Sequence, residues 1–409
     1  MAGIERITII HDRVEARGGA TGLARLCALE YRKLGLPVTF LTGEDGDAEL
    51  EAAGVEIIGL GQQGLRTAGT LTALRKGLHN SEAAYLVASW IEANDTPGTV
   101  YHLHNWAQIL SPAVFGALRA VEARTVVSCH DFFNICPNGG LLNFPKGTVC
   151  HLKAMSSACW MSQCDRQSPV HKYWRMIRQL HLRNRAGFPE SAMTFVCLNK
   201  GMEDVMREAG FDAPNLTHIP NPAQAYTPER IPAEENDAFL FVGRLNREKG
   251  ADLAAEAAHR AGVQLIMVGE GELAAPLSQR YPEIDFPGFC SRAQIAEFAS
   301  KARALIVPGR WREPYGLVIA DAALSGLPVI LSAPSTLSGD IARRDMGTVF
   351  DPAEAGALEA TLRALSEDDT AIARFSHNAH SRAGEICNTP ESWAASFIEL
   401  FETKLGLAR

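Results

Sequence analysis

The chain has 409 residues, of which 46% are hydrophobic and 21% are charged. This balance is typical of a soluble globular protein with room for two domains of ordinary size. The formal net charge of -8 argues against general nucleic-acid binding, because such binding depends on a basic surface.

The first apolar run, residues 7–10, is too short for a secretory signal, and the acid Glu5 precedes it. No apolar stretch approaches membrane-spanning length. We therefore expect a cytoplasmic protein whose nine cysteines are reduced thiols or metal ligands rather than disulfides.

Short apolar runs alternate with helical stretches through the first half of the chain. The runs are residues 7–10, 38–41, 55–58, 100–103, 125–128 and 194–198. They predict a parallel sheet with helices on both faces. Residues 17–21, with Arg17 and Gly19 among them, follow the first run and precede a helix, so their glycines allow close backbone approach to a phosphate or sugar. His102 and His104 alternate at the end of one strand and should face the same side of the sheet, while His130 follows the next strand.

Four cysteines gather in the loop-rich stretch of residues 134–168, and they are Cys136, Cys150, Cys159 and Cys164. Four thiols can hold zinc tetrahedrally, but these spacings lack the paired short gaps of common zinc sites. A structural zinc site and unligated or redox-active thiols therefore remain equal alternatives. Residues 166–185 then carry six basic side chains, interleaved with aromatic and aliphatic ones and with no acid. This segment is either a solvated helix face or a docking surface for an anionic membrane or a lipid-diphosphate acceptor.

A second series of strands begins at Phe239 and continues at residues 265–268, 304–307, 329–331 and 348–350. Between the two series lie residues 219–222 and the polar run 228–237, which we interpret as the interdomain linker. The last helix, residues 390–405, is amphipathic. The sequence thus predicts two α/β domains, residues 1–222 and 223–389, and a closing C-terminal helix.

Two cations follow the strand that begins the second series. Arg244 can fork onto phosphate oxygens, and Lys249 lies at a helix start as a point charge. Together they can neutralise a departing diphosphate without a metal, although either cation alone would more often be a solvated surface charge.

Two carboxylates, Glu313 and Asp321, lie eight residues apart around a turn that opens a helix. Glu313 follows the strand 304–307, and Asp321 lies about two turns into the helix. An acid in the loop can meet a sugar hydroxyl and the acid further along can hold a ribose diol, while amides at a helix start suit a diphosphate. Those amides belong to Gly316, Leu317 and Val318. Such acids are common on α/β units, but the cations on a second unit of the same sheet indicate one pocket.

At these positions the chain resembles the retaining GT-B glycosyltransferases called glycosyltransferase group 1 (family 4 type). The matching motifs are Gly243-Arg244 with Lys249-Gly250, the turns at residues 268–271 and 288–289, and residues 313–316 through 328–330. Their order and spacing agree with the family from about residue 238 to 350, and more loosely before it. One departure is Asp321, where the family usually has Glu.

The resemblance implies two Rossmann-like domains with parallel sheets facing across a cleft, and a C-terminal helix, residues 390–409, packed back on the first domain. It implies that the second domain binds a nucleotide-sugar donor and the first a saccharide or lipid-linked acceptor. It also implies retaining hexosyl transfer in cell-envelope or exopolysaccharide synthesis, by a front-face mechanism with no required metal or other cofactor. Gly19 would lie over the donor diphosphate, and His130, in preference to His104, would lie near the transferred sugar.

Two other functions are compatible with parts of the pattern. A non-catalytic GT-B scaffold in a polysaccharide assembly would keep the fold, and the Asp321 departure leaves room for it. An NAD-dependent dehydrogenase also uses parallel sheets with glycine turns, but no Gly-x-Gly-x-x-Gly turn with a distant acid follows the first strand. Whichever holds, peripheral contact with the inner face of the plasma membrane would involve residues 166–185.

Overall fold

The computed structural model describes residues 3–15, 18–65, 67 and 69–407. The chain divides into two compact units. Unit 1 comprises Met1–Gly139, Leu152–Pro220 and Pro390–Arg409, and unit 2 comprises Gly140–His151 and Asn221–Thr389. Within the described residues, no helix is both long enough and apolar enough to cross a membrane.

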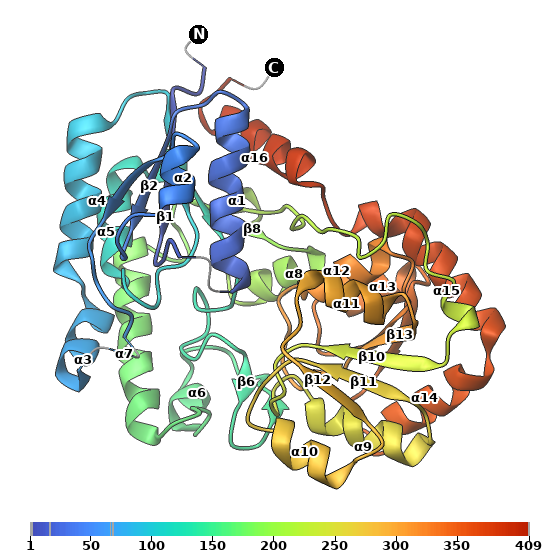
Figure 1. Ribbon diagram of the computed structural model, residues 1–409. Helices are drawn as coiled ribbons and strands as arrows, with labels where there is room; N and C mark the ends of the chain where they lie inside the picture. The colour runs from blue at the N-terminus through green and yellow to red at the C-terminus, as the bar shows by residue number, and fades with distance from the viewer. Residues whose placement is uncertain (1–2, 16–17, 66, 68, 408–409) are drawn as a thin grey trace. The chain divides into compact units, whose positions relative to one another are not determined.

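Unit 1 is built on a seven-stranded sheet whose strands all pair in parallel (Figure 1). In spatial order the strands are β3 (Glu56–Gly59), β2 (Val38–Thr42), β1 (Arg6–His11), β4 (Thr99–Leu103), β5 (Thr125–Ser128), β8 (Thr194–Cys197) and β9 (Leu216–His218). Strands β2, β4, β5 and β8 are buried at every position, as expected of parallel strands covered on both faces.

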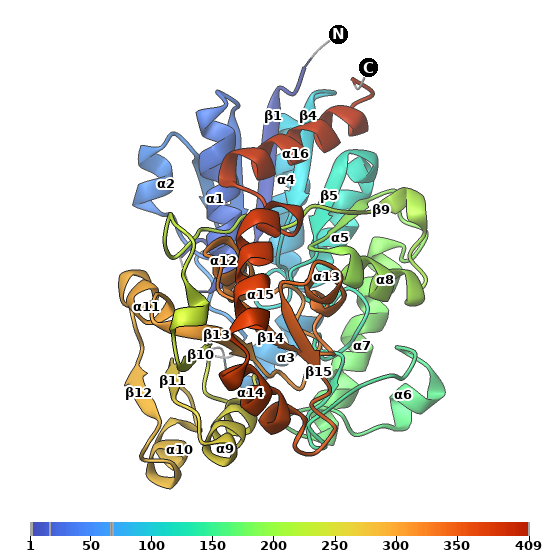
Figure 2. The same cartoon turned by 90° about the vertical axis from the view of Figure 1, so that its right-hand side faces the viewer.

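Helices cover both faces of this sheet. They are α1 (Gly19–Lys33), α2 (Ala48–Ala52), α3 (Thr70–Leu78), α4 (Ser81–Asn94), α5 (Ala113–Leu118), α6 (Ser157–Met161), α7 (Pro169–Ala186), α8 (Lys200–Glu208) and α16 (Pro390–Lys404), with 3-10 turns at Arg119–Arg124 and Ala213–Asn215. On one face α1 and α16 lie side by side (Figure 2) and share one apolar core with β1, β2 and β4. On the other face, Trp90 of α4 donates a hydrogen bond to Thr8 of β1.

The C-terminal helix α16 contributes large side chains to the unit 1 core. Trp393, Phe397 and Phe401 are all buried, and they recur every four residues on one side of the helix. The ring of Phe397 lies 4.5 Å from that of His102 on β4, centroid to centroid. Because these apolar side chains pack into the core that contains β4, the last helix belongs to unit 1, although α15, which precedes it in the chain, belongs to unit 2.

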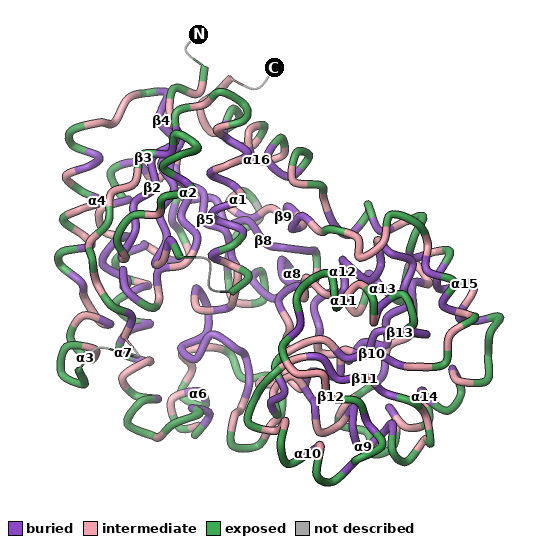
Figure 3. Tube along the Cα trace, viewed as in Figure 1, coloured by how far each residue is buried: buried purple, intermediate pink, exposed green. Residues whose placement is uncertain are grey.

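Unit 2 contains a six-stranded parallel sheet and a two-stranded hairpin. The sheet order is β12 (Asp285–Gly288), β11 (Leu265–Val268), β10 (Ala238–Val242), β13 (Ala302–Val307), β14 (Val329–Ser332) and β15 (Gly347–Phe350), and the hairpin is β6 (Leu142–Asn143) with β7 (Thr148–Val149). The helices are α9 (Ala251–Ala261), α10 (Ala274–Arg280), α11 (Arg292–Ala299), α12 (Leu317–Leu324), α13 (Ser338–Arg343), α14 (Ala357–Glu367) and α15 (Asp369–Arg382), with 3-10 turns at Ala233–Glu235 and Ala383–Glu385. The inner strands β11, β10, β13 and β14 form the buried centre of the unit (Figure 3).

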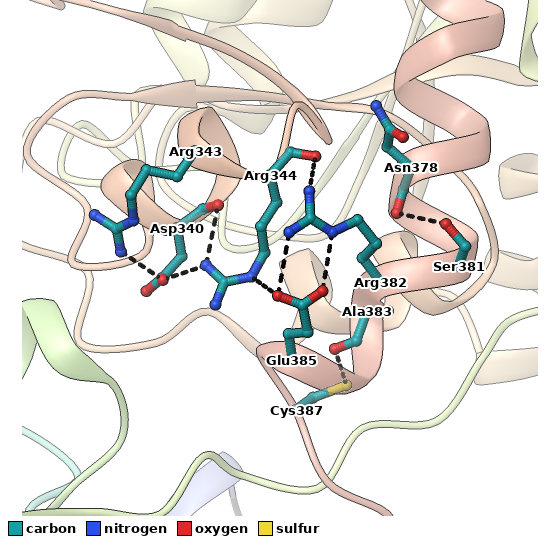
Figure 4. Close-up of polar contacts among 9 residues, drawn as sticks. All are labelled: Asp340, Arg343, Arg344, Asn378, Ser381, Arg382, Ala383, Glu385 and Cys387. Carbon is teal, nitrogen blue, oxygen red and sulfur yellow. Dashed lines mark hydrogen bonds and ion pairs between the residues drawn. The ribbon is translucent and has the colours of Figure 1, made fainter.

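A network of charges joins α13 to the end of α15 (Figure 4). Arg344 contacts Asp340 at 2.6 Å and Glu385 at 2.9 Å, and Arg382 contacts the same Glu385 at 2.9 Å. The two guanidinium groups lower the pKa of Glu385 from its ordinary value. The network therefore holds together the segment that precedes α16 in the chain.

The structure bears out most predicted strands and corrects one prediction. The pattern of apolar runs did not predict β9 and β12, because both strands are short and β12 contains Pro287. The polar run 228–237 is not a free linker, because Ile231 and Ala233 are buried in unit 2. Its polar composition reflects exposed positions that alternate with these two anchors.

Candidate functional site

The predicted cation Lys249 and the predicted acid Glu313 are in contact in unit 2. The ammonium of Lys249 forms an ion pair with Oε2 of Glu313, and Trp311 Nε1 donates to the same oxygen at 3.1 Å. The ammonium also lies 5.1 Å from the centre of the Trp311 ring, a cation–π distance. The loops that follow the adjacent strands β10 and β13 thus meet through these three side chains.

Backbone contacts fix the two loops against each other. Arg310 donates its amide to the carbonyl of Glu248 at 2.9 Å, and its guanidinium grips Asp252 of α9 at 2.6 and 2.8 Å. Gly250 has φ +74°, and a Cβ there would lie 2.1 Å from the carbonyl oxygen of Pro308. A glycine is therefore required at this position both for its conformation and for the close approach.

The side chain of Arg244 is available to a ligand, whereas that of Lys249 is paired with Glu313. The residue is exposed, and no side-chain partner for it occurs in the described part of the chain. Its backbone lies in the same loop, where the amide of Leu245 bonds to Glu270 at 2.8 Å. A guanidinium held on such a braced loop is suited to phosphate oxygens.

The start of α12 offers backbone donors beside this pair. Gly316 has φ +79° and begins the helix without a side-chain cap. Among the described residues, no acceptor is found for the amides of Leu317 and Val318. The carbonyl of Glu313 is anchored by the amide and hydroxyl of Thr336, at 3.1 and 3.0 Å. Open amides at a helix start, close to the Glu313 side chain that pairs with Lys249, form an anion-binding arrangement.

Asp321 is already engaged within unit 2. One carboxylate oxygen accepts from the amide of Gln224 at 2.9 Å, and the other from Arg292 at 2.9 Å. Burial raises the pKa of Asp321, and these two donors oppose the rise. Arg292 also lies over the ring of Tyr226. No sequence pattern pointed to Arg292, because it lies 29 residues from Asp321 on another helix. Contact between Asp321 and a ribose stays a prediction.

In unit 1, Gly19 begins α1 and is exposed, and its neighbour Gly18 has φ +92°. No side chain caps the helix start. Arg17, from the same predicted loop, lies outside the described residues. The open start of this 15-residue helix is compatible with the predicted approach to a phosphate.

Four histidines gather at the carboxyl ends of β1, β4 and β5. The rings of His102 and His104 lie 4.1 Å apart, as expected for side chains on one face of a strand. His104 Nδ1 and His130 Nε2 are 2.8 Å apart, and these two rings are stacked. His11 lies edge-on to His104 at 6.1 Å. Burial lowers the pKa of His130 to about 4, and those of His11 and His102 to about 3, so all three rings are neutral at pH 7.

Residues 17–222 match the profile of the glycosyl transferase 4-like domain, and residues 225–382 match that of glycosyl transferases group 1. The first match alone covers half of the chain. The chain belongs to the group 1 glycosyltransferases. This membership argues against the dehydrogenase alternative.

Individual relatives of this group 1 glycosyltransferase are distant. Glycogen synthase of Mycobacterium tuberculosis (strain CDC 1551 / Oshkosh) is 26% identical over 279 residues, covering 63% of this chain and 64% of the relative. The chain therefore spans slightly less than two thirds of that relative's length. Sucrose-phosphate synthase from Thermosynechococcus elongatus aligns with a TM-score of 0.68 at 17% identity, over 99% of this chain and 100% of the other. Anabaena HepE in complex with UDP aligns with a TM-score of 0.65 at 17% identity, over 97% and 100%. These likenesses confirm the predicted GT-B fold class.

The cysteines of this group 1 glycosyltransferase are not gathered as a four-thiol cluster within either unit. Cys136, Cys159 and Cys164 are buried in unit 1, whereas Cys150 belongs to unit 2. The buried ammonium of Lys172 lies 3.1 Å from the sulfur of Cys164 and 3.6 Å from that of Cys159. The structural zinc site stays a prediction.

A different set of ligand atoms lies closer together. In the described part of the chain, Cys27, His102 and His104 offer three ligand atoms within 4.8 Å of one another. Both nitrogens of His102 are already engaged, with the hydroxyls of Tyr31 at 3.3 Å and Ser128 at 2.8 Å. Binding a metal there would break one of these bonds in the core, so we assign the set to packing.

Most of the basic segment 166–185 lies in α7, and its first three residues precede that helix. Two of its cations do not face solvent. Lys172 is 1% exposed, and Arg178 is 4% exposed and donates to the carbonyl of Ala107 at 3.1 Å. Arg175 pairs with Asp165 at 2.8 Å. The prediction of six cations on one docking face is therefore wrong for Lys172 and Arg178. Lys172 is buried against Cys159 and Cys164, and Arg178 against Ala107 and the ring of Trp106.

Proposed function

We propose that this chain is a retaining glycosyltransferase that moves a hexose from a nucleotide sugar to a saccharide or lipid-linked acceptor in cell-envelope or exopolysaccharide synthesis. The observation that carries the proposal is the contact between Lys249 and Glu313, next to the open amides of α12. This contact brings a cation that can bind a diphosphate next to a carboxylate that can bind sugar hydroxyls. The UDP complex of HepE supports a nucleotide diphosphate as the ligand.

Donor binding exchanges the Lys249–Glu313 ion pair for two ligand contacts. The diphosphate takes the ammonium of Lys249, the guanidinium of Arg244 and the amides of residues 316–318, while Glu313 turns to the sugar hydroxyls. Each group thereby keeps a charged or polar partner, so the exchange leaves no buried charge alone. Asp321 meets the ribose by giving up one of its two present donors, Gln224 or Arg292.

The transfer requires that the leaving group receive a proton and that its negative charge be stabilised. The bond between the anomeric carbon and the diphosphate oxygen breaks, and a bond to the acceptor oxygen forms on the same face of the sugar. The acceptor's proton passes to the departing diphosphate oxygen. Because negative charge grows on the diphosphate as the bond breaks, Arg244 and Lys249 stabilise the transition state more than the bound donor. His130 lies near the transferred sugar.

The test is release of nucleotide from a panel of sugar nucleotides, with a cell-envelope lipid extract as acceptor. Arg244→Ala should lower kcat by roughly two orders of magnitude, as loss of other preorganised charge donors does. Lys301→Ala, which removes an exposed cation of unit 2 outside the site, should leave it unchanged. Normal turnover of Arg244→Ala would refute the assignment. Donor binding without turnover under any acceptor would favour the non-catalytic scaffold.

We further propose that α7 brings the enzyme to an anionic membrane, at the inner face of the plasma membrane, where a lipid-linked acceptor would lie. Val170 is 74% exposed, and Tyr173, Ile177 and Leu180 follow it as exposed apolar side chains on successive turns. Exposed Arg185 lies near the end of the same helix, which contains no acid. Exposed apolar side chains beside cations are typical of a helix that lies in a membrane interface.

Co-sedimentation with vesicles of increasing anionic lipid content measures this contact. Binding should rise with anionic lipid and fall with salt, since each cation near the surface contributes about 1 kcal/mol. Replacing Ile177 and Leu180 by Ser should weaken binding, whereas Tyr85→Ser, at an exposed aromatic residue of α4, should not. Binding that ignores lipid charge and salt would contradict the proposal.

A further inference from the structure

The hydrogen bond between His104 and His130 joins the ends of two neighbouring strands. His104 directly follows β4, and His130 lies two residues after β5. Nδ1 of His104 and Nε2 of His130 are 2.8 Å apart, and the ring planes differ by only 11°. His102 lies at 4.1 Å from His104 and His11 at 6.1 Å. The His104 ring therefore lies among three other histidine rings, of which His130 is the one that it contacts through a hydrogen bond.

Both rings in this bond are neutral. Burial lowers the pKa of His130 to about 4 and that of His104 well below its ordinary value, to which the neighbouring histidines add. A neutral imidazole carries one proton, on either Nδ1 or Nε2. Either His104 donates to His130, or His130 donates to His104, and the two arrangements place the second proton differently.

The unpaired nitrogen of His104 decides between them. Its Nε2 is buried and has no hydrogen-bond partner among the described residues. If His130 donated, that Nε2 would carry a buried proton with no acceptor, whereas if His104 donates, it carries only a bare lone pair. An orphaned buried N–H is rarer than an unsatisfied acceptor. Donation from His104 Nδ1 to His130 Nε2 is therefore favoured.

We propose that His104 is a positioning residue, which donates its Nδ1–H to His130 and so fixes the tautomer that His130 presents. His130 then has a bare Nε2 facing His104 and a proton on Nδ1. The His130 ring is partly exposed, and its Nδ1 has no partner within the part of the chain that the structure describes. The exposed edge of His130 is thus a hydrogen-bond donor, and not a base.

This inference rests on the proposed function, because it gives His130 a defined task there. A donor at Nδ1 can bond to a sugar hydroxyl or a phosphate oxygen of the donor substrate. It cannot take the acceptor's proton, which agrees with transfer of that proton to the leaving diphosphate. His104 contributes only through the ring that it holds.

The tautomer can be measured without any activity. Nitrogen-15 NMR of the histidine rings in the wild-type protein at pH 7 distinguishes protonated from bare ring nitrogens, and His130→Gln assigns the signals. We expect His130 to be protonated at Nδ1 and bare at Nε2, and His104 to show the same. Protonation of His130 at Nε2 would overturn the proposal, whatever the enzyme's activity.

Two variants of His104 test its effect on transfer. His104→Asn keeps an N–H donor at about the same distance from the backbone as Nδ1, while His104→Phe keeps a ring and removes the donor. By analogy with outer partners of metal-binding histidines, His104→Phe should lower kcat roughly 10- to 100-fold with little change in KM. His104→Asn should recover most of the loss.

His102→Phe is the control, because it alters the same core without touching the bond to His130. It should keep kcat near the wild-type value, and thermal unfolding of all three variants reports any loss of folding. Equal losses of kcat in His102→Phe and His104→Phe would show a merely structural role and overturn the proposal. If wild type transfers no sugar, the proposed function fails, and the NMR measurement still decides the tautomer.

Discussion

Burial of His102 makes unit 1 sensitive to mild acid. Its side chain is 0% exposed, and burial lowers its pKa to about 3, against about 6.5 in an unfolded chain. Because the folded-state pKa lies below the unfolded value, the unfolded state binds the proton first as the pH falls. Protonation of His102 in the unfolded state therefore lowers the free energy of unfolding progressively as the pH falls from about 6.5 to about 3.

The size of this loss follows from the two pKa values. At pH 7 the unfolded chain is mostly unprotonated, so His102 changes the free energy of unfolding very little. A pH of 5 lies about 1.5 units below the unfolded-state pKa, so protonation stabilises the unfolded state by about 2 kcal/mol, while the folded state stays unprotonated. His102 thus removes about 2 kcal/mol from the stability of unit 1 between pH 7 and pH 5.

Urea unfolding at pH 7 and pH 5 measures this loss, with hydrogen exchange of β1 and β4 peptides to report unit 1 itself. His102→Gln lacks the titrating ring, so it should lose about 2 kcal/mol less than wild type over this range, whatever its stability at pH 7. His181→Gln, at an exposed position of α7, should keep the wild-type pH dependence. If His102→Gln and wild type show the same pH dependence, the reasoning is wrong.

Two further predictions concern the donor site and the last helix. Glu313→Gln should mainly lower kcat and Asp321→Ala should mainly raise the KM for the donor, because the first contact matters most at the transition state. Steady-state kinetics separates the two, and wild-type activity of Glu313→Gln would contradict the site. Phe397→Ala should lower the free energy of unfolding by about 3–5 kcal/mol, because it leaves a cavity against His102 in the unit 1 core. Denaturant titration measures this, and a change below about 1 kcal/mol would contradict the packing of α16.

Much of the architecture follows from local pattern in the sequence. Runs of apolar residues between helical stretches predict the parallel strands, because a strand covered on both faces is apolar at every position. Glycines such as Gly250 and Gly316 mark turns for the same local reason, since only glycine adopts their positive φ readily. Lys249 and Glu313 could be named as partners in one pocket, because carboxyl ends of parallel strands meet at one edge of a sheet.

The tertiary structure alone decided which side chains touch. Lys249 pairs with Glu313 across 64 residues because β10 and β13 are neighbours in the sheet. The sequence of neither strand specifies which strand lies beside it. Lys172 and Arg178 are buried against Cys164 and Ala107, which lie outside α7, although their charge suggested solvent. His104 bonds to His130 because β4 and β5 pair in one register. Local periodicity specifies which residues form an element, but contacts between elements depend on packing that spans the whole unit.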